Sequence, residues 1–248
     1  MGEGALRGRV LVITRPAGSA GALARRVRAL SGTPVLLPGL ALRGPEDIAA
    51  TRAALREGFA GELVIFTSPA AVRHAARLMP LHTAAVVLAV GQGTARTLRR
   101  HGVREPLIPR QQDSDGLLEH PMLQDLRHRH VTLVGAPGGR GILRSRLVAR
   151  GARLQEVHVY RRVPPRLDRR HVEAALGLPG SARVLLSSEE ALQNLCRLLP
   201  SRALAHLRTT IAVVSSERLA VAAREAGFMH VELASSALAE DLLAAAAR

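Results

Sequence analysis

Hydroxyl-bearing and basic side chains follow short β-branched runs at several points of this sequence, and they are the first candidates for chemistry. They are Thr14, Arg15, Thr67, Ser68, Thr94, Arg140, Ser187, Ser188, Ser216 and Arg218. Hydroxyls and backbone N–H groups at the start of a helix suit anions, because the helix N-terminus carries a partial positive charge. The simpler interpretation of any one turn is ordinary helix capping by serine or threonine. Several such turns in one chain favour an anion-binding site.

Carboxylates and histidines are scarce at these turns, apart from three glutamates just inside the following helices, Glu189, Glu190 and Glu217. A pair of catalytic carboxylates, or a nucleophile with its base, is therefore disfavoured. The glycine-rich stretch at 135–141 lacks the ending of a phosphate loop, and Arg96 stands where a dinucleotide fingerprint needs glycine. The histidines show no metal-binding spacing, so we expect no metal site.

The only tyrosine of the chain, Tyr160, lies in the stretch "EVHVYRRVPP" at 156–165. This stretch alternates like a strand and then meets two arginines and a proline pair that must end it. A lone tyrosine in a strand usually packs its ring and turns its hydroxyl to water. A phenol that takes part in chemistry is the alternative.

The composition points to layered α/β structure with an aliphatic core. The chain has 248 residues, enough for one large domain or two of ordinary size, and 47% of them are apolar. Aromatic residues are only 2%, so alanine, leucine and valine must supply most of the buried surface. Such a composition suits sheets of parallel strands.

The formal net charge is +15, and all 35 basic residues are arginine. This excess reflects either a compositional bias without a specific partner or an anionic ligand, because arginine binds carboxylates and phosphates with two hydrogen bonds. We expect no nucleic-acid partner, since no basic stripe with interleaved aromatics and no reading helix is visible.

The single cysteine, Cys196, excludes an internal disulfide and fits a reducing compartment. No apolar run approaches the ~20 residues that span a membrane, and the first ten residues lack the apolar core of a signal peptide. We expect a cytoplasmic protein that has no membrane partner.

Six β-branched runs predict strands, at residues 9–14, 62–67, 85–90, 130–135, 183–187 and 210–215. Weaker strand candidates lie near Val35, Val157 and Val231. Alanine- and arginine-rich stretches with helical spacing follow the runs. This alternation of strands and helices predicts an α/β fold with parallel sheets.

The sequence also repeats itself. The stretch "VIFTSPAAV" begins at Val64 and "VLLSSEEAL" begins at Val184, an offset of 120 residues. Near the start of the chain, "VLVITRP" from Val10 parallels "VTLVGAP" from Val131. The chain therefore looks like two related halves, each with several βα units.

Seven short motifs, taken in order, resemble those of the uroporphyrinogen-III synthase family and together span nearly the whole chain. They are "TRP" at 14–16, "FTSPAAV" at 66–72, "AVGQGTA" at 89–95, "GGR" at 138–140, "LVARGA" at 147–152, "VYRR" at 159–162 and "VVSSERLA" at 213–220. Each motif is short, and their order and spacing carry the resemblance.

The resemblance implies two doubly wound parallel-sheet domains, with the second inserted in the first and a two-stranded linker joining them. The expected first domain comprises residues 1–37 and 163–248, and the second comprises 42–156. The expected linkers are residues 38–41 and 157–162, which we identify with two of the weak strand candidates. Tyr160 would then lie in the return crossing, at a hinge rather than in either sheet.

The resemblance also implies an enzyme, a hydro-lyase that cyclises hydroxymethylbilane to uroporphyrinogen III with inversion of ring D and loss of water. It implies no cofactor and no metal. The substrate bears eight carboxylates, which suits an excess of arginine and many hydrogen-bond donors. We expect a monomer, with hand-over of the substrate from hydroxymethylbilane synthase.

By the same resemblance, Tyr160 is the candidate catalytic residue, because a neutral phenol can donate a hydrogen bond to the departing hydroxyl of ring A. The candidate substrate-binding residues are Arg15, Thr67, Ser68, Thr94, Arg140, Ser187, Ser188, Ser216 and Arg218. Arg218 stands where the first half has Thr94, and it either contacts a carboxylate or lies on the helix surface. The alternative function is a non-catalytic α/β module that binds small anions or nucleotides.

Overall fold

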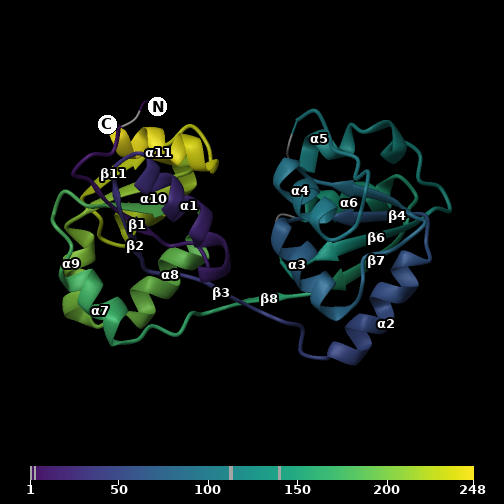
Figure 1. The fold of residues 1–248 in the computed structure, drawn as a ribbon, viewed down its shortest axis with the longest axis horizontal. Helices are drawn as coiled ribbons and strands as arrows, with labels where there is room; N and C mark the ends of the chain where they lie inside the picture. The colour runs from purple at the N-terminus through teal and green to yellow at the C-terminus, as the bar shows by residue number, and fades with distance from the viewer. Residues whose placement is uncertain (1, 3, 112–113, 139–140) are drawn as a thin grey trace. The chain divides into compact units, whose positions relative to one another are not determined.

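The computed structural model describes residues 2, 4–111, 114–138 and 141–248, and the chain divides into two compact units (Figure 1). Unit 1 comprises Met1–Leu42 and Val163–Arg248, and unit 2 comprises Arg43–Arg162. Each unit has its own parallel sheet, so the predicted α/β class with parallel strands is confirmed.

Unit 1 is built on a five-stranded sheet in which all neighbouring strands are parallel. Its strands are β1 (Val10–Ile13), β2 (Thr33–Leu36), β9 (Arg183–Leu186), β10 (Ile211–Val214) and β11 (His230–Leu233). They lie in the order β11-β10-β9-β1-β2, which is 2-1-3-4-5 when the strands are numbered within the unit. The strand order reverses between β1 and β9, and sheets of this type bind ligands beyond the carboxyl ends of the strands at that point.

Helices cover both faces of this sheet. They are α1 (Ala17–Ala29), α7 (Arg169–Leu176), α8 (Glu189–Leu198), α9 (Ser201–Arg208), α10 (Glu217–Glu225) and α11 (Ala239–Ala247). Because side chains alternate along a strand, Leu11 and Ile13 pack with α1 and α11, whereas Val12 packs with α7 to α10. The unit is therefore doubly wound.

Unit 2 is built on a four-stranded parallel sheet. Its strands are β4 (Leu63–Phe66), β5 (Val86–Ala89), β6 (His130–Gly135) and β7 (Arg153–His158). They lie in the order β5-β4-β6-β7, so the strand order reverses between β4 and β6. The carboxyl ends of β4 and β6 are the first place to look for a ligand site in this unit.

Helices also cover both faces of the sheet in unit 2. They are α2 (Ile48–Phe59), α3 (Pro69–Leu78), α4 (Gln92–Arg100), α5 (Ser114–Leu118), α6 (Ile142–Ala149) and the 3-10 helix η1 (Pro121–Leu123). The helices α5, η1 and α6 pack against Leu63 and Ile65. On the other face α2 and α3 pack on β4 and β6, where Phe59 meets Phe66 edge to face with ring centroids 6.3 Å apart.

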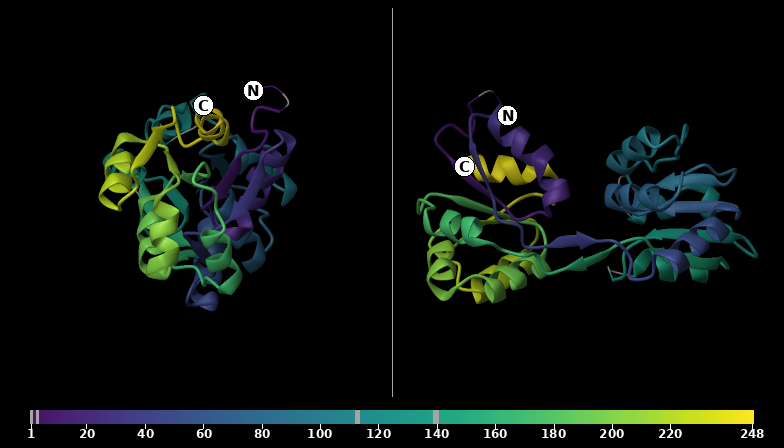
Figure 2. Two further views of the ribbon diagram at one scale, coloured as in Figure 1. Left: turned by 90° about the vertical axis from the view of Figure 1, so that its left-hand side faces the viewer. Right: turned by 60° about the horizontal axis from the view of Figure 1, so that its bottom comes forward.

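Two short strands connect the units. They are β3 (Ala41–Arg43) and β8 (Arg161–Val163), and they lie side by side as a two-stranded sheet (Figure 2). The two strands are 120 residues apart in the sequence, which is the offset of the repeat. The two crossings are therefore equivalent positions of the two related halves.

Strand pairing repeats with an offset of 120 residues, one fewer than the offset between Val10 and Val131 in the sequence motifs. Val12 of β1 pairs with Val184 of β9, and Thr132 of β6 pairs with Val64 of β4. Val12 and Thr132 are 120 residues apart in the sequence, and so are Val64 and Val184. The order β5-β4-β6-β7 of unit 2 thus repeats the order β10-β9-β1-β2 of unit 1, and the central pairs share their register.

The connection between the units differs from the predicted one. Val157 and His158 pair with β6 as the last residues of β7, and Val159 N donates to Gly135 O at 3.0 Å. The weak strand candidates near Val35 and Val157 are the edge strands β2 and β7, so it was wrong to identify them with the linkers. Most residues of these two strands are exposed or half-buried, as expected of strands that have a neighbour on one side only. Of the helices within the described ranges, none combines the length and apolar character that a bilayer crossing needs.

Candidate functional site

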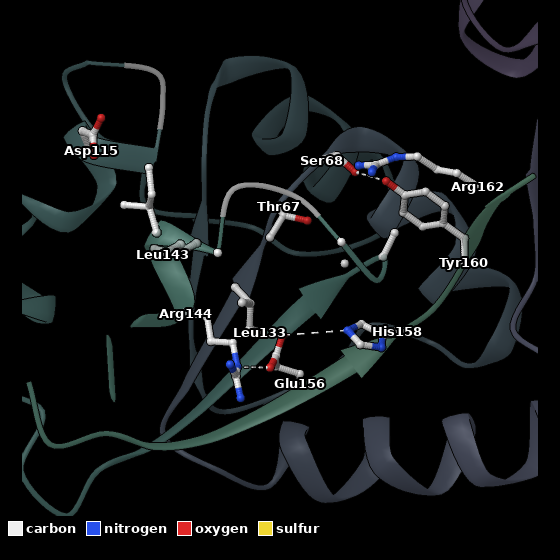
Figure 3. A pocket seen from close by; sticks show the side chains of 15 residues that line it. Thr67, Ser68, Asp115, Leu133, Leu143, Arg144, Glu156, His158, Tyr160 and Arg162 are labelled. Atoms are coloured by element: carbon white, nitrogen blue, oxygen red, sulfur yellow. Dashed lines mark hydrogen bonds and ion pairs between the residues drawn. The ribbon is translucent and has the colours of Figure 1, made fainter. Parts of the chain in front are cut away.

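The carboxyl ends of β4, β6 and β7 border a cavity of about 560 Å³ in unit 2 (Figure 3). The cavity lies where the strand order reverses, as expected for a ligand site in a doubly wound sheet. The hydroxyls of Thr67, Ser68 and Tyr160 line it, together with the charged or titratable side chains of Glu156 and His158. The cavity therefore offers both hydrogen-bond donors and acceptors.

Ser68 caps helix α3 directly after β4. Its Oγ accepts a hydrogen bond from Ala71 N at 3.1 Å, and Pro69 occupies the first helical position, where an N–H would have no partner in the helix. The same Oγ lies 3.3 Å from Tyr160 Oη, and either hydroxyl can donate. The N-terminus of α3 is thus linked through Ser68 to the only phenol of the chain.

Tyr160 lies two residues beyond the end of β7 and is 6% exposed. Its ring stacks on the imidazole of His74 in α3, with centroids 5.2 Å apart and 26° between the ring planes. Its hydroxyl points toward Ser68 (Figure 3). Tyr160 lies between the end of β7 and the start of β8, outside both parallel sheets, and Val159 before it is still bonded to β6.

Thr67 lies at the end of β4, against the end of β6. Its Oγ1 donates to Val134 O at 3.2 Å. Glycine at position 135 allows this close approach, because a Cβ there would lie 2.7 Å from Thr67 Oγ1. Thr94, in the first turn of α4, is 4% exposed and is not among the residues that line the cavity.

Sequence reasoning missed an ionic cluster in the cavity wall. Arg144 Nε, at the start of α6, lies 2.6 Å from Glu156 Oε1, and His158 Nε2 lies 3.8 Å from Glu156 Oε2. The signal was present in the sequence, because Glu156, His158 and Tyr160 are spaced by two and so share one side of an extended segment. In this stretch the sequence analysis assigned a role to Tyr160 alone.

Arg162 continues the same spacing and was also missed. It is exposed and lines the cavity, and its side chain extends toward Ser68 and Tyr160 (Figure 3). Arg140, which the sequence made a candidate, lies outside the described residues.

The predicted residues of unit 1 lie at the carboxyl ends of β1, β9 and β10. Arg15 Nη2 donates to Ala237 O at 3.0 Å, and burial lowers the pKa of its guanidinium. Ser188 caps α8 and Ser216 caps α10, each accepting a backbone N–H three residues on. Ser187 is half-buried just before the first of these caps. Helix capping thus accounts for two of the predicted hydroxyls.

Arg218 forms an ion pair with Glu189 rather than projecting freely from its helix. The pair joins the first turns of α8 and α10, and the Arg218 side chain remains 80% exposed. Both possibilities that the sequence left for Arg218, a carboxylate contact or a surface position, are compatible with this geometry. A substrate carboxylate would have to compete with Glu189.

Among residues 2, 4–111, 114–138 and 141–248, no three histidine, cysteine, aspartate or glutamate side chains gather as metal ligands. What the cavity does provide is a chain of hydroxyls that begins at a helix N-terminus, flanked by arginines. Such an arrangement can orient an anionic ligand and donate a hydrogen bond at one defined point.

Known proteins resemble this chain over nearly its full length. The family described as uroporphyrinogen-III synthase HemD matches residues 21–244. The uroporphyrinogen-III synthase of Salmonella typhimurium is 30% identical over 247 residues, which cover 95% of this chain and 98% of that protein. The uroporphyrinogen-III synthase of Escherichia coli is 31% identical over 160 residues, or 63% of this chain and 65% of that protein.

Solved structures support the fold. The crystal structure of uroporphyrinogen-III synthetase from Helicobacter pylori gives a TM-score of 0.60 at 16% identity, covering 95% of this chain and 97% of that one. A mutant uroporphyrinogen III synthase from Thermus thermophilus gives 0.57 at 21% identity, covering 96% of each chain. The match over residues 21–244 and the identity to the Salmonella protein establish that the chain belongs to the uroporphyrinogen-III synthase family.

Proposed function

We propose that this protein cyclises the linear tetrapyrrole hydroxymethylbilane to uroporphyrinogen III, inverting ring D and releasing water, and is therefore a hydro-lyase. Family membership supports the reaction. The observation that ties it to a site is the pair of hydroxyls of Ser68 and Tyr160, at the cavity where the strand order of unit 2 reverses. The comparisons do not favour the alternative, a non-catalytic module that binds small anions or nucleotides.

The reaction needs a donor at the departing hydroxyl of ring A. The pyrrole nitrogen supplies the electron pair that expels this hydroxyl, and a proton must reach it so that it leaves as water. The substituted α-carbon of ring D then attacks the resulting azafulvene, and the spiro intermediate fragments and closes again through the other α-carbon. Since most of this reactivity belongs to the pyrroles, the protein has to fold the substrate, exclude water and assist departure.

We assign the assistance to Tyr160, acting through a short relay. The N–H of Ala71, in the first turn of α3, donates to Ser68 Oγ, and the Ser68 hydroxyl can donate to Tyr160 Oη. The phenol proton is then available to a group in the cavity. Each bond in such a chain polarises the next, and the positive end of the helix acts in the same direction.

The mixed charge of the cavity suits a tetrapyrrole. Arg144 and Arg162 can meet carboxylates of the substrate, whereas the Glu156 carboxylate can accept from pyrrole N–H groups. Binding that engages both kinds of group would fix the orientation of each pyrrole as well as its position.

The proposal also gives substrate contacts to the residues that the sequence singled out. They are Arg15, Thr67, Ser68, Thr94, Arg140, Ser187, Ser188, Ser216 and Arg218. We further propose that the two units are the domains of a cytoplasmic monomer that uses no cofactor and receives its substrate from hydroxymethylbilane synthase. The single cysteine, Cys196, supports a reducing compartment.

The experiment that tests the function is an isomer assay. Hydroxymethylbilane is generated in the cuvette by hydroxymethylbilane synthase, the products are oxidised to porphyrins, and isomers I and III are separated by chromatography. Uncatalysed closure gives the symmetric isomer I. We expect isomer III in proportion to the amount of this protein, and isomer I alone would overturn the proposal.

A further inference from the structure

The phenol of Tyr160 is held by an aromatic partner that no step of the proposed reaction uses. His74 lies in the second turn of α3, and its imidazole stacks on the phenol with centroids 5.2 Å apart and 26° between the planes. Tyr160 lines the cavity, whereas His74 is not among its lining residues. The imidazole therefore meets the phenol from behind, away from the space that a ligand would fill.

The phenol needs such support because its other restraints are weak. The contact between Ser68 Oγ and Tyr160 Oη is 3.3 Å, long for two hydroxyls, which prefer about 2.7–2.8 Å. Tyr160 also lies beyond the last residue pair of β7, so the sheet does not hold its backbone directly. A stacked ring restricts both side-chain torsions and keeps the hydroxyl within reach of Ser68.

The repeat gives an independent reason to assign this task to position 74. The equivalent position 120 residues later is Asn194, whose amide donates to Gly39 O at 2.9 Å. Gly39 is in turn the equivalent of Val159, the residue before Tyr160. In each unit, therefore, the same position of the capped helix holds the segment that leads into the crossing strand.

The charge state of His74 fits this role. Burial lowers the pKa of its imidazole, and the neighbouring cations Arg77 and Arg73 lower it further. A lowered pKa favours the neutral form of the ring, and a neutral imidazole packs against a phenol as a flat aromatic plane.

We propose that His74 is a positioning residue, which stacks on Tyr160 and holds its hydroxyl at Ser68, facing the cavity. The proposal rests on the proposed function for its effect on rate. Its structural part, a stack that restrains one phenol, can be measured in the absence of any substrate.

The chain provides a direct spectroscopic readout. It has one tyrosine and no tryptophan, so its tyrosine fluorescence comes from Tyr160 alone. We expect His74→Ala to raise the quenching of this fluorescence by acrylamide at least about twofold, and His74→Phe to keep it near the wild-type value. His101→Ala, at an exposed histidine that ends helix α4, is the matched control and should leave the quenching unchanged.

The kinetic readout separates positioning from folding. A catalytic group displaced by about 1 Å can cost about a hundredfold in rate, so we expect His74→Ala to lower kcat about 10–100-fold with little change in KM. His74→Phe should restore kcat to within about threefold of wild type. In a Tyr160→Phe background His74→Ala should have no further effect on kcat, because the hydroxyl that it positions is gone.

If His74→Ala keeps the quenching and the kcat of wild type, the proposal is overturned. A further loss of kcat on adding His74→Ala to Tyr160→Phe would overturn it as well. Failure of His74→Phe to restore kcat would overturn it too, since the imidazole would then act by more than stacking. If His74→Ala does not fold, His74→Gln is measured in its place and is expected to behave likewise. Absence of isomer III from the wild-type protein would instead refute the proposed function and leave the fluorescence test in force.

Discussion

Replacement of Tyr160 by phenylalanine removes one hydroxyl and keeps the ring in its stack. The contact that disappears is the 3.3 Å one with Ser68, and a typical hydrogen bond contributes about 0.5–1.5 kcal/mol net. Ser68 keeps its bond from Ala71 N, so no buried group loses its only partner. The free energy of unfolding should therefore fall by no more than about 1 kcal/mol, a shift of about 2–4 °C in Tm.

The expected effect on turnover is much larger. A positioned acid contributes about 10²–10⁴-fold to a rate, which is about 2.7–5.5 kcal/mol of transition-state stabilisation. If the phenol assists the departure of the ring A hydroxyl, Tyr160→Phe should have a kcat that is lower by a factor of this order and should remain folded. Substrate binding should change little, because the ring still closes the same wall of the cavity.

The assay is steady-state production of isomer III by wild type and Tyr160→Phe, with thermal unfolding followed by circular dichroism as the check of folding. A variant that keeps both wild-type kcat and the wild-type ratio of isomers would refute the role given to the phenol. A variant that melts more than about 10 °C lower would instead contradict the structural reasoning, since it would mean that the hydroxyl supports the fold.

Three further predictions use the helix caps, the titration of His74 and the ion pair of unit 1. Ser68→Ala and Ser188→Ala each remove one helix cap and should each lower the free energy of unfolding by about 1 kcal/mol. Only Ser68→Ala also disturbs the phenol, so steady-state assays should show the larger loss of kcat for Ser68→Ala. The pKa of His74 in the folded protein lies below its ordinary value of 6.5, so the unfolded chain binds the proton first as the pH falls through 6.5. In thermal melts, wild type should therefore lose stability relative to His74→Phe between pH 7 and pH 5. Above pH 7.5 the difference in stability between the two proteins should stay constant. Arg218→Ala breaks an exposed pair with Glu189 and should change stability by less than about 1 kcal/mol, yet raise KM at unchanged kcat if the guanidinium binds a substrate carboxylate.

The main strands could be predicted because each is a short β-branched run ended by a small or hydroxyl residue. The runs at 130–135 and 183–187, for example, agree with β6 and β9 to within one residue at either end. The strands β3 and β8 could not be recognised in this way. Each has only three residues and includes arginine, and its partner is 120 residues distant, so no local periodicity marks it.

The site was predictable only in part, for a related reason. Ser68 and Tyr160 were singled out separately, and only the fold shows that the hydroxyls are 3.3 Å apart. Glu156 and His158 lie within an edge strand, so the turns at the strand ends do not reveal them. The contact with His74 depends on the packing of α3 beside the end of β7, which no spacing in the sequence reveals.

The order of strands in unit 1 has a consequence for the way the chain folds during its synthesis. The central strand β1 lies between β2 and β9, and its partner residues in β9 follow it by more than 170 positions. Unit 2 is continuous in sequence, so it can fold while the second half of unit 1 is still being made. At about 5–20 residues per second, β1 and α1 must wait on the order of ten seconds or more for that partner. A nascent chain of this protein therefore exposes an unpaired apolar strand edge for that time, and chaperones that cover such edges should bind it early.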